Sequence, residues 1–170
     1  MISWTRGFIL LAALQGAILA STFGRGAAGR SGAFLEAGDD LSGLVLTNLA
    51  GDSLVLPGRE DLLVLTYDAD CGFSREMMGM WEAWASENRG FFRTLLVSSQ
   101  PDPHFAVKDS MAGDDLEVWG FAEDGDGRLS GSLLRRVPWV FLVGSSGKIQ
   151  SEGHGRRIAE IAAGRGNDQS

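Results

Sequence analysis

The chain contains one cysteine, Cys71, which begins the tetrapeptide Cys71-Gly72-Phe73-Ser74 where an expected strand gives way to an expected helix. A thiol in the first turn of a helix faces the positive end of the helix dipole and backbone N–H groups without intrahelical partners. Both favour the thiolate, which is the reactive form of cysteine. The spacing is that of a Cys-x-x-Cys redox motif in which Ser74 replaces the second, resolving cysteine. Any thiol chemistry therefore uses one sulfur and forms no internal disulfide.

The neighbours of this thiol act on it in opposite directions. The Ser74 hydroxyl can donate a hydrogen bond to the thiolate, which stabilises the charged form. Asp68 and Asp70 precede Cys71, and a carboxylate beside a thiol opposes its ionisation. A mixed disulfide formed at Cys71 needs an external thiol to resolve it.

Apolar runs predict the strands that position the thiol. Two short runs around a turn at 50–52 predict a hairpin, and a nearly continuous apolar run predicts a strand covered on both faces. Residues 118–122 are expected to form a brief strand or a loop. The other expected strands are residues 44–49, 53–56, 62–67, 91–97, 139–143 and 148–150.

An amphipathic helix is predicted at 74–88, directly after the thiol. Its apolar stripe at i, i+4, i+7 and i+8 consists of Met77, Trp81, Trp84 and Ala85. Gly90 is a plausible stop. Short helices are also expected at 104–112 and 158–163. This order of elements predicts an α/β domain with a mixed sheet.

The N-terminal segment is apolar enough to enter a membrane. No charged residue interrupts residues 7–24, a length between that of a signal-peptide core and the roughly 20 residues of a spanning helix. We expect residues 1–24 to be an uncleaved signal anchor, with a cleaved signal peptide as the alternative. Residues 25–40 are expected to be a flexible tether, 41–165 the domain and 166–170 a disordered tail. The domain is then extracytoplasmic, in a periplasm.

Charge restricts the possible partners. After residue 30 the chain has 12 basic and 22 acidic residues, a net charge of about −10. Nucleic acid and anionic lipid surfaces repel such a domain. We therefore exclude a nucleic-acid role and expect membrane contact only through the N-terminal segment.

Two motifs in this order and at this separation resemble the thioredoxin-like superfamily. The first is Cys71–Ser74 between its strand and helix, and the second is Val-Pro-Trp-Val-Phe-Leu-Val at 137–143, followed by Gly-Lys-Ile at 147–149. With the hairpin at 44–56, they are most similar to the redoxin branch, which includes membrane-tethered thiol–disulfide proteins of the cytochrome c maturation type. The resemblance spans residues 41–163. It implies a thioredoxin-like α/β fold, in which helices flank a mixed central sheet that an N-terminal β-hairpin extends.

The resemblance also implies a partner-binding turn. In that family the proline equivalent to Pro138 follows a cis peptide bond and lies beside the reactive sulfur. A sharp cis-proline turn exposes the backbone of the preceding residue, here Val137, which can pair with an extended partner strand. The partner disulfide would then meet Cys71, and Trp139 is expected to line the same groove. The alternative is that Pro138 merely begins an edge strand.

Two families that use one thiol fit less well. Peroxiredoxins carry a Pro-x-x-x-Thr/Ser-x-x-Cys signature, which is absent from residues 64–71. Monothiol glutaredoxins share Cys-Gly-Phe-Ser and bind an iron–sulfur cluster with glutathione. Their Trp-Pro-Thr and Gly-Gly-Asp segments are missing here, and they lack the opening hairpin. We interpret the shared tetrapeptide as coincidence.

No metal or cofactor is expected. His104 and His154 are isolated and lack metal-ligand spacing to Cys71. The Asp-Gly-Asp-Gly run at 124–127 lacks the later glutamate of an EF-hand and is interpreted as a surface turn. The methionines of the predicted helix do not share one side, so core packing is preferred to Cu(I) binding.

Two functional hypotheses remain. In the first, the protein performs monothiol thiol–disulfide exchange: Cys71 captures a partner's sulfur, Ser74 stabilises the thiolate, and Val137 and Pro138 bind the partner backbone. In the second, the fold is a binding or assembly module without redox turnover. A thiol pKa well below the usual value of about 8.5 favours the first.

Overall fold

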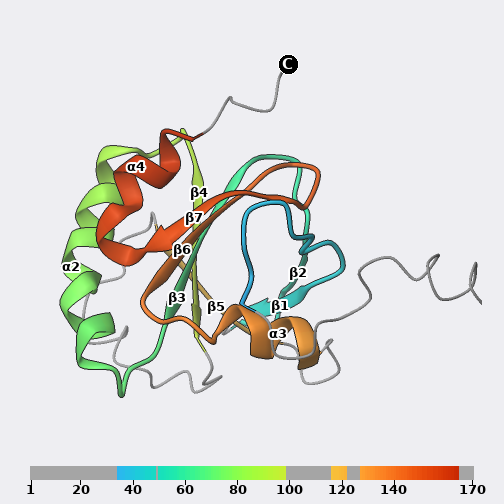
Figure 1. The fold of residues 1–170 in the computed structure, drawn as a ribbon, viewed down its shortest axis with the longest axis horizontal. Helices are drawn as coiled ribbons and strands as arrows, with labels where there is room; N and C mark the ends of the chain where they lie inside the picture. Colours follow the sequence, from blue (N-terminus) through green and yellow to red (C-terminus); the bar gives the residue numbers. More distant parts are fainter. Residues whose placement is uncertain (1–33, 49, 99–115, 122–126, 165–170) are drawn as a thin grey trace, which may run out of the picture. The chain divides into compact units, whose positions relative to one another are not determined.

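A seven-stranded mixed sheet forms the centre of the fold (Figure 1). The structure is a computed structural model and describes residues 34–48, 50–98, 116–121 and 127–164. The strand order is β2-β1-β5-β4-β3-β6-β7. β3, β4 and β5 run parallel, and the remaining neighbours pair antiparallel. The strands are β1 (Val45–Asn48), β2 (Ser53–Val55), β3 (Leu62–Tyr67), β4 (Arg93–Ser98), β5 (Leu116–Phe121), β6 (Trp139–Val143) and β7 (Ile149–His154).

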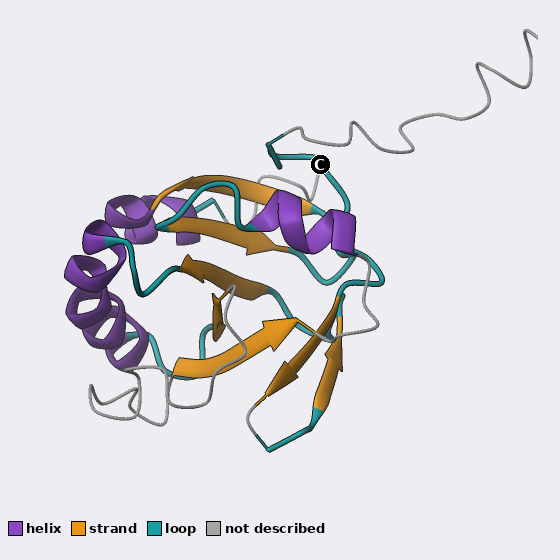
Figure 2. Cartoon of the chain, turned by 90° about the horizontal axis from the view of Figure 1, so that it is seen from below, coloured by secondary structure: helices purple, strands orange, loops and turns teal. Residues whose placement is uncertain are grey.

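Helices lie on both faces of this sheet (Figures 1 and 2). Helices α2 (Gly72–Glu87) and α4 (Ile158–Ala162) pack on one face, and α3 (Gly127–Leu133) packs on the other. A short 3-10 turn, η2 (Gly155–Arg157), leads from β7 into α4. The sheet therefore has a hydrophobic core on each side.

Strand β3 contributes to both cores because all six of its residues are buried. Successive side chains of a strand point to opposite faces. Leu62 and Val64 accordingly join the core under α3, whereas Leu63 and Leu65 join the core under α2 and α4. Thr66, the residue before the last of this strand, is a wholly buried hydroxyl residue.

Helix α2 forms as its apolar stripe predicts. Met77, Trp81 and Ala85 are buried, and Trp81 is wholly inaccessible. The helix begins at Gly72, two residues before the predicted start. Gly90, with φ of +83°, follows its C-terminal end and adopts a conformation that favours glycine.

The predicted fold class is confirmed, with three elements underestimated: β5, α3 and β7, which spans Ile149–His154 rather than residues 148–150. The predicted hairpin forms β1 and β2, which join the sheet through β5. β5 is a six-residue strand in the sheet interior, rather than the brief strand or loop expected at 118–122. Helix α3 was not predicted, because Gly127 and Gly131 are poor helix formers. Burial of Leu133 in the core offsets this weak propensity.

The segment before β1 belongs to the domain at least from residue 34. Leu35 is buried in the core under α3. Gly38 N donates to Ile149 O at 2.8 Å, and Ile149 N donates to Asp39 O at 2.9 Å. Residues 34–40 therefore belong to the domain and not to the flexible tether predicted for residues 25–40.

Several predictions fall outside the described residues. They are the signal anchor at 1–24, the helix at 104–112 and the tail at 166–170. Among the residues that the structure does describe, no helix has the length and apolar character needed to span a membrane.

Candidate functional site

Cys71 is the N-cap residue of α2. Its backbone is extended, with φ of −82° and ψ of 114°, and Arg75 N donates to its C=O at 3.2 Å. Its own N–H donates to Asp68 O at 3.1 Å, which closes the turn between β3 and α2. The side chain is partly exposed and makes no capping hydrogen bond. The thiol is therefore accessible to a reagent, beside the N–H groups of the first helical turn.

The pKa of the Cys71 thiol is lowered from its usual value. The backbone N–H of Ser74 is the main cause, and the Ser74 hydroxyl and the Phe73 N–H act in the same direction. Partial burial and the negative charge of Asp68 raise the pKa, but the net shift remains downward. The expected thiolate-favouring environment is thus present, opposed by one of the two nearby carboxylates.

Ser74 joins the first turn of α2 to the end of β3. The residue is wholly buried, and its Oγ accepts a hydrogen bond from Asp68 N at 3.3 Å. Because the hydroxyl oxygen is the acceptor in that bond, its proton remains available for the Cys71 sulfur. This geometry is compatible with the stabilising role predicted for Ser74.

Residues 136–139 form a turn at the sheet edge that Cys71 also occupies. The Val137–Pro138 peptide bond is cis, as the resemblance implied. Thr66 holds both ends of the turn: its Oγ1 donates to Arg136 O at 2.7 Å and accepts from Trp139 N at 3.1 Å. Thr66 lies near the carboxyl end of β3, and Cys71 follows the same end of that strand. The thiol and the proline turn therefore lie at one edge of the sheet.

Packing also joins this turn to α2. Trp81 Nε1 donates to Gly155 O at 3.0 Å, and Gly155 N donates to Pro138 O at 3.1 Å. A Cβ atom at Gly155 would lie 2.6 Å from the Trp81 ring and 3.3 Å from Pro138 Cβ. The helix that carries the thiol and the proline turn therefore form one packed unit.

The backbone of Val137 is the unpaired part of the turn. Within the described part of the chain, neither its N–H nor its C=O forms a hydrogen bond. The residue is partly exposed. Backbone polar groups without an internal partner can pair with an extended segment of another chain.

Trp139 belongs to a cluster on the α3 face of the sheet. Its indole N–H donates to the Glu152 carboxylate, and the Arg136 guanidinium lies over its ring, 4.8 Å from the centroid. Arg136 also pairs with Glu152 at 3.4 Å and lies 4.3 Å from the Phe34 ring centroid. Trp139 packs against the core under α3, whereas α2 covers the opposite face. Its ring is thus engaged in this cluster, and the expectation that it lines the groove beside Pro138 stays a prediction.

Sequence reasoning missed Thr66 and Arg136. A signal for Thr66 was present, because a hydroxyl in a strand buried on both faces requires a hydrogen-bond partner. Arg136 had no comparable signal, since its partners Phe34 and Glu152 are distant in the sequence. Only the fold brings them together.

The described residues offer no cluster of metal ligands. Among the described residues, no group of three or more His, Cys, Asp or Glu side chains could hold a metal ion. His154 Nδ1 accepts a hydrogen bond from Arg156 N at 3.3 Å, and its ring meets Trp139 edge-on. His104 and residues 124–126 lie outside the described part of the chain.

The three methionines of α2 do not converge. Met77 and Met78 are buried in the core under α2 and α4, while Met80 is exposed. This arrangement agrees with core packing rather than with a thioether site for Cu(I).

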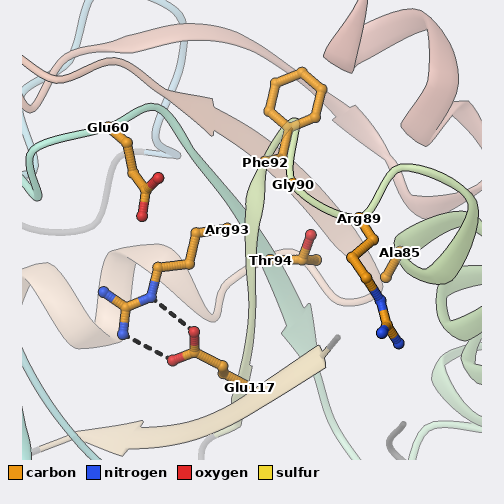
Figure 3. A pocket seen from close by; sticks show the side chains of 8 residues that line it. All are labelled: Glu60, Ala85, Arg89, Gly90, Phe92, Arg93, Thr94 and Glu117. Atoms are coloured by element: carbon orange, nitrogen blue, oxygen red, sulfur yellow. Dashed lines mark hydrogen bonds and ion pairs between the residues drawn. The ribbon is translucent and has the colours of Figure 1, made fainter. Parts of the chain in front are cut away.

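A pocket of about 360 Å³ lies at the other edge of the sheet (Figure 3). Arg93 and Glu117 form a double hydrogen-bonded ion pair there, with both N–O distances 2.8 Å. Arg93 pairs in the sheet with Leu62, the first residue of β3, whereas Cys71 follows the last. The pocket is therefore separate from the thiol. Its lining residues are Glu60, Ala85, Arg89, Gly90, Phe92, Arg93, Thr94 and Glu117.

Comparisons with known proteins establish the fold. No family model matches the chain, and no curated protein matches its sequence. A solved thiol:disulfide interchange protein from Bacteroides sp. aligns with a TM-score of 0.60 at 17% identity, covering 79% of this chain and 94% of that one. The thioredoxin domain of a thiol-disulfide oxidoreductase from Bacteroides vulgatus gives 0.59 at 17% identity, covering 76% and 96%.

A third solved structure, the pneumococcal exposed lipoprotein thioredoxin from Streptococcus pneumoniae, aligns with a TM-score of 0.54 at 14% identity. It covers 70% of this chain and 96% of that one. At these identities the likeness concerns the backbone alone. The chain has a thioredoxin-like fold.

Proposed function

We propose that this protein exchanges a disulfide with a partner protein through Cys71 alone. The observation that carries the proposal is a thiol of lowered pKa at the sheet edge that also bears the cis Val137–Pro138 turn. Several solved proteins of the same fold are described as thiol–disulfide interchange proteins or oxidoreductases, which supports the same class of chemistry.

The proposed reaction uses one sulfur of this chain. The Cys71 thiolate attacks one sulfur of a partner disulfide, the partner S–S bond breaks, and a new S–S bond joins Cys71 to the partner. The second partner sulfur leaves as a thiolate and takes a proton from water. Because the chain has no other cysteine, a thiol from outside must attack the mixed disulfide and restore Cys71.

One further feature supports binding of a protein rather than a small disulfide, and another supports the exchange step itself. The unpaired backbone of Val137 is suited to pairing with an extended partner segment. The Ser74 hydroxyl is suited to stabilising the thiolate as the attacking and departing group. Electron flow in either direction is compatible with this geometry.

Trapping a mixed disulfide tests the proposal. The full-length chain, expressed in cells that are quenched with acid and alkylated before analysis, should run as a larger adduct on non-reducing gels and return to its own size with reductant. Cys71→Ala should remove every adduct. Complete absence of adducts from the unmodified chain, together with partner capture unchanged in Cys71→Ser, would instead support a binding module without turnover.

We further propose that residues 1–24 hold or export the domain outside the cytoplasm. The uncharged apolar stretch supports this, and one protein of the same fold is described as an exposed lipoprotein. A membrane-impermeant maleimide should label Cys71 in intact spheroplasts, with Cys71→Ala as the blank. Labelling only after lysis would place the domain on the cytoplasmic side.

A further inference from the structure

Arg136, the first residue of the turn at 136–139, is held by several side-chain contacts. The Arg136 guanidinium lies 4.3 Å from the Phe34 ring centroid and 4.8 Å from that of Trp139. Glu152 accepts from both Arg136 and Trp139. The side chains of Arg136 and Glu152 are only 23% and 20% exposed, so the ion pair is largely removed from water. A guanidinium placed over two aromatic rings and paired with a carboxylate is an arrangement that lysine does not reproduce.

The backbone on both sides of Val137 is fixed as well. The Thr66 hydroxyl binds Arg136 O at 2.7 Å and Trp139 N at 3.1 Å. Val137 lies between these anchors, and among the described residues its own N–H and C=O have no partner. The turn is therefore ordered in advance, while the N–H and C=O of Val137 have no partner among the described residues.

We infer that Arg136 is a positioning residue that presents the Val137 backbone to an extended peptide segment carrying the partner disulfide. The inference rests on the proposed exchange function and adds the residue that prepares the turn. Ordering a binding segment before association lowers the entropic cost of binding. Arg136 does not touch the thiol, so it should affect peptide disulfides and leave the intrinsic reactivity of Cys71 unchanged.

The inference also extends to the start of the domain. Phe34 contacts Arg136, and Glu36 lies 3.8 Å from the same guanidinium. These residues come from the segment that precedes β1, whereas the turn precedes β6. Arg136 thus joins the N-terminal end of the described chain to the peptide-binding backbone.

Two disulfides with the same leaving group test this role. One is Ellman's reagent, which is small, and the other is a short extended peptide whose single cysteine is disulfide-linked to the same nitrothiobenzoate. In each reaction the Cys71 thiolate displaces nitrothiobenzoate, which is released as a coloured thiolate. A peptide methylated on its backbone nitrogens is a third substrate, because methylation removes strand pairing and leaves the disulfide intact.

The full-length Arg136→Met variant should react with Ellman's reagent at the wild-type rate. Its reaction with the peptide disulfide should slow about tenfold, the factor expected when roughly one backbone residue must be ordered on binding. The rate of Arg136→Lys with the peptide disulfide should fall between those of the wild type and Arg136→Met. Methylation of the peptide should slow the wild type but have little further effect on Arg136→Met. Arg93→Met is the matched control, since Arg93 also pairs with a glutamate beside a tryptophan but at the opposite sheet edge.

The outcomes separate the two proposals. Equal slowing of both disulfides, or no slowing of either, in Arg136→Met would overturn the positioning role. A wild type that reacts with Ellman's reagent and not with the peptide would instead remove the proposed exchange with protein disulfides. Should Arg136→Met not fold, Phe34→Ala removes one stacking ring, and nitrogen-15 relaxation of Val137 should then show a lower order parameter. An unchanged order parameter would contradict the inference.

Discussion

The same three residue types meet in two clusters on either side of β3, with different surroundings. At the carboxyl end of β3, Arg136 and the indole N–H of Trp139 both contact Glu152. On the other side of β3, Arg93 at the amino end of β4 binds Glu117 of β5, and Trp119 Nε1 donates to the same carboxylate at 3.1 Å. In each cluster the guanidinium also lies over the indole ring, at 4.8 Å and 5.8 Å from the centroid.

The two clusters differ in solvent exposure and in the structure that lies beside each of them. Arg136 and Glu152 are 23% and 20% exposed and lie beside a turn fixed by Thr66. Arg93 and Glu117 are 30% and 39% exposed and border a pocket (Figure 3). Partly exposed ion pairs add little net stability. We therefore expect substitutions in the Arg93 cluster to be tolerated and substitutions in the Arg136 cluster, at the same end of β3 as the thiol, to have larger effects.

The largest effect should come from Trp81, which joins α2 to the proline turn. Trp81→Ala should lower the free energy of unfolding by about 3–5 kcal/mol, because it opens a cavity in a core where the side chain is wholly buried. It also leaves Gly155 O without the indole donor. Urea denaturation measures the change. Trp84→Ala, on the same helix but partly exposed, should lower the free energy of unfolding clearly less. Equal losses in the two variants would contradict the role of Trp81 in joining α2 to the proline turn.

Gly155 should give the next largest effect. An added Cβ would lie 2.6 Å from the Trp81 ring, so Gly155→Ala should destabilise the domain by about 1–3 kcal/mol through overpacking. Gly79→Ala is the control, because nothing lies within 4 Å of its Cβ position in α2. It should raise the unfolding free energy by up to about 1 kcal/mol through helix propensity. Thermal melts of the two variants should therefore shift in opposite directions.

Ser74 allows the thiol to be examined more closely. Ser74→Ala should raise the pKa of Cys71, since the hydroxyl contributes to lowering it. The loss of one buried hydrogen bond to Asp68 N should also cost about 1 kcal/mol of stability. The pH dependence of alkylation by iodoacetamide gives the pKa, and Ser86→Ala, exposed on the same helix, is the control. An unchanged thiol pKa in Ser74→Ala would argue against the role assigned to this hydroxyl.

The smallest effect on the free energy of unfolding should appear in acid, at the ion pair between Arg93 and Glu117. The hydrogen bond from Arg93 is the main cause that lowers the pKa of Glu117 below its ordinary value. A carboxylate with a lowered folded-state pKa contributes stability above its unfolded value of about 4.3 and loses it as pH falls through the folded value. Because the pair is partly exposed, the contribution should stay below about 1 kcal/mol.

Glu117→Gln provides the measurement for that ion pair. Its unfolding free energy should fall less steeply than that of the wild type as pH drops below about 4.3. It should match the wild type in reaction with both disulfide probes. A slower peptide reaction in Glu117→Gln would contradict the separation of the two clusters.

Much of the fold was predictable because its signals are local. The apolar run of β3, the stripe of α2 and the turn between β1 and β2 each depend on neighbouring residues, and all three formed as predicted. Helix α3 was missed because its glycines weaken the local signal, and its stability comes from burial against distant strands. The predicted tether was too long for the same reason, since residues 34–40 are ordered by contacts with β7 and Arg136.

The sequence by itself determined the setting of Cys71: one sulfur, at a helix N-terminus, without a second cysteine in the chain. The position and type of a residue in its own helix are enough for that conclusion. Only the tertiary structure decided how the proline turn is held, because Thr66, Arg136 and Glu152 come from separate elements. It also decided that Trp139 supports the turn from the α3 face. Side-chain contacts between distant segments depend on sheet register and strand order, which local patterns do not specify.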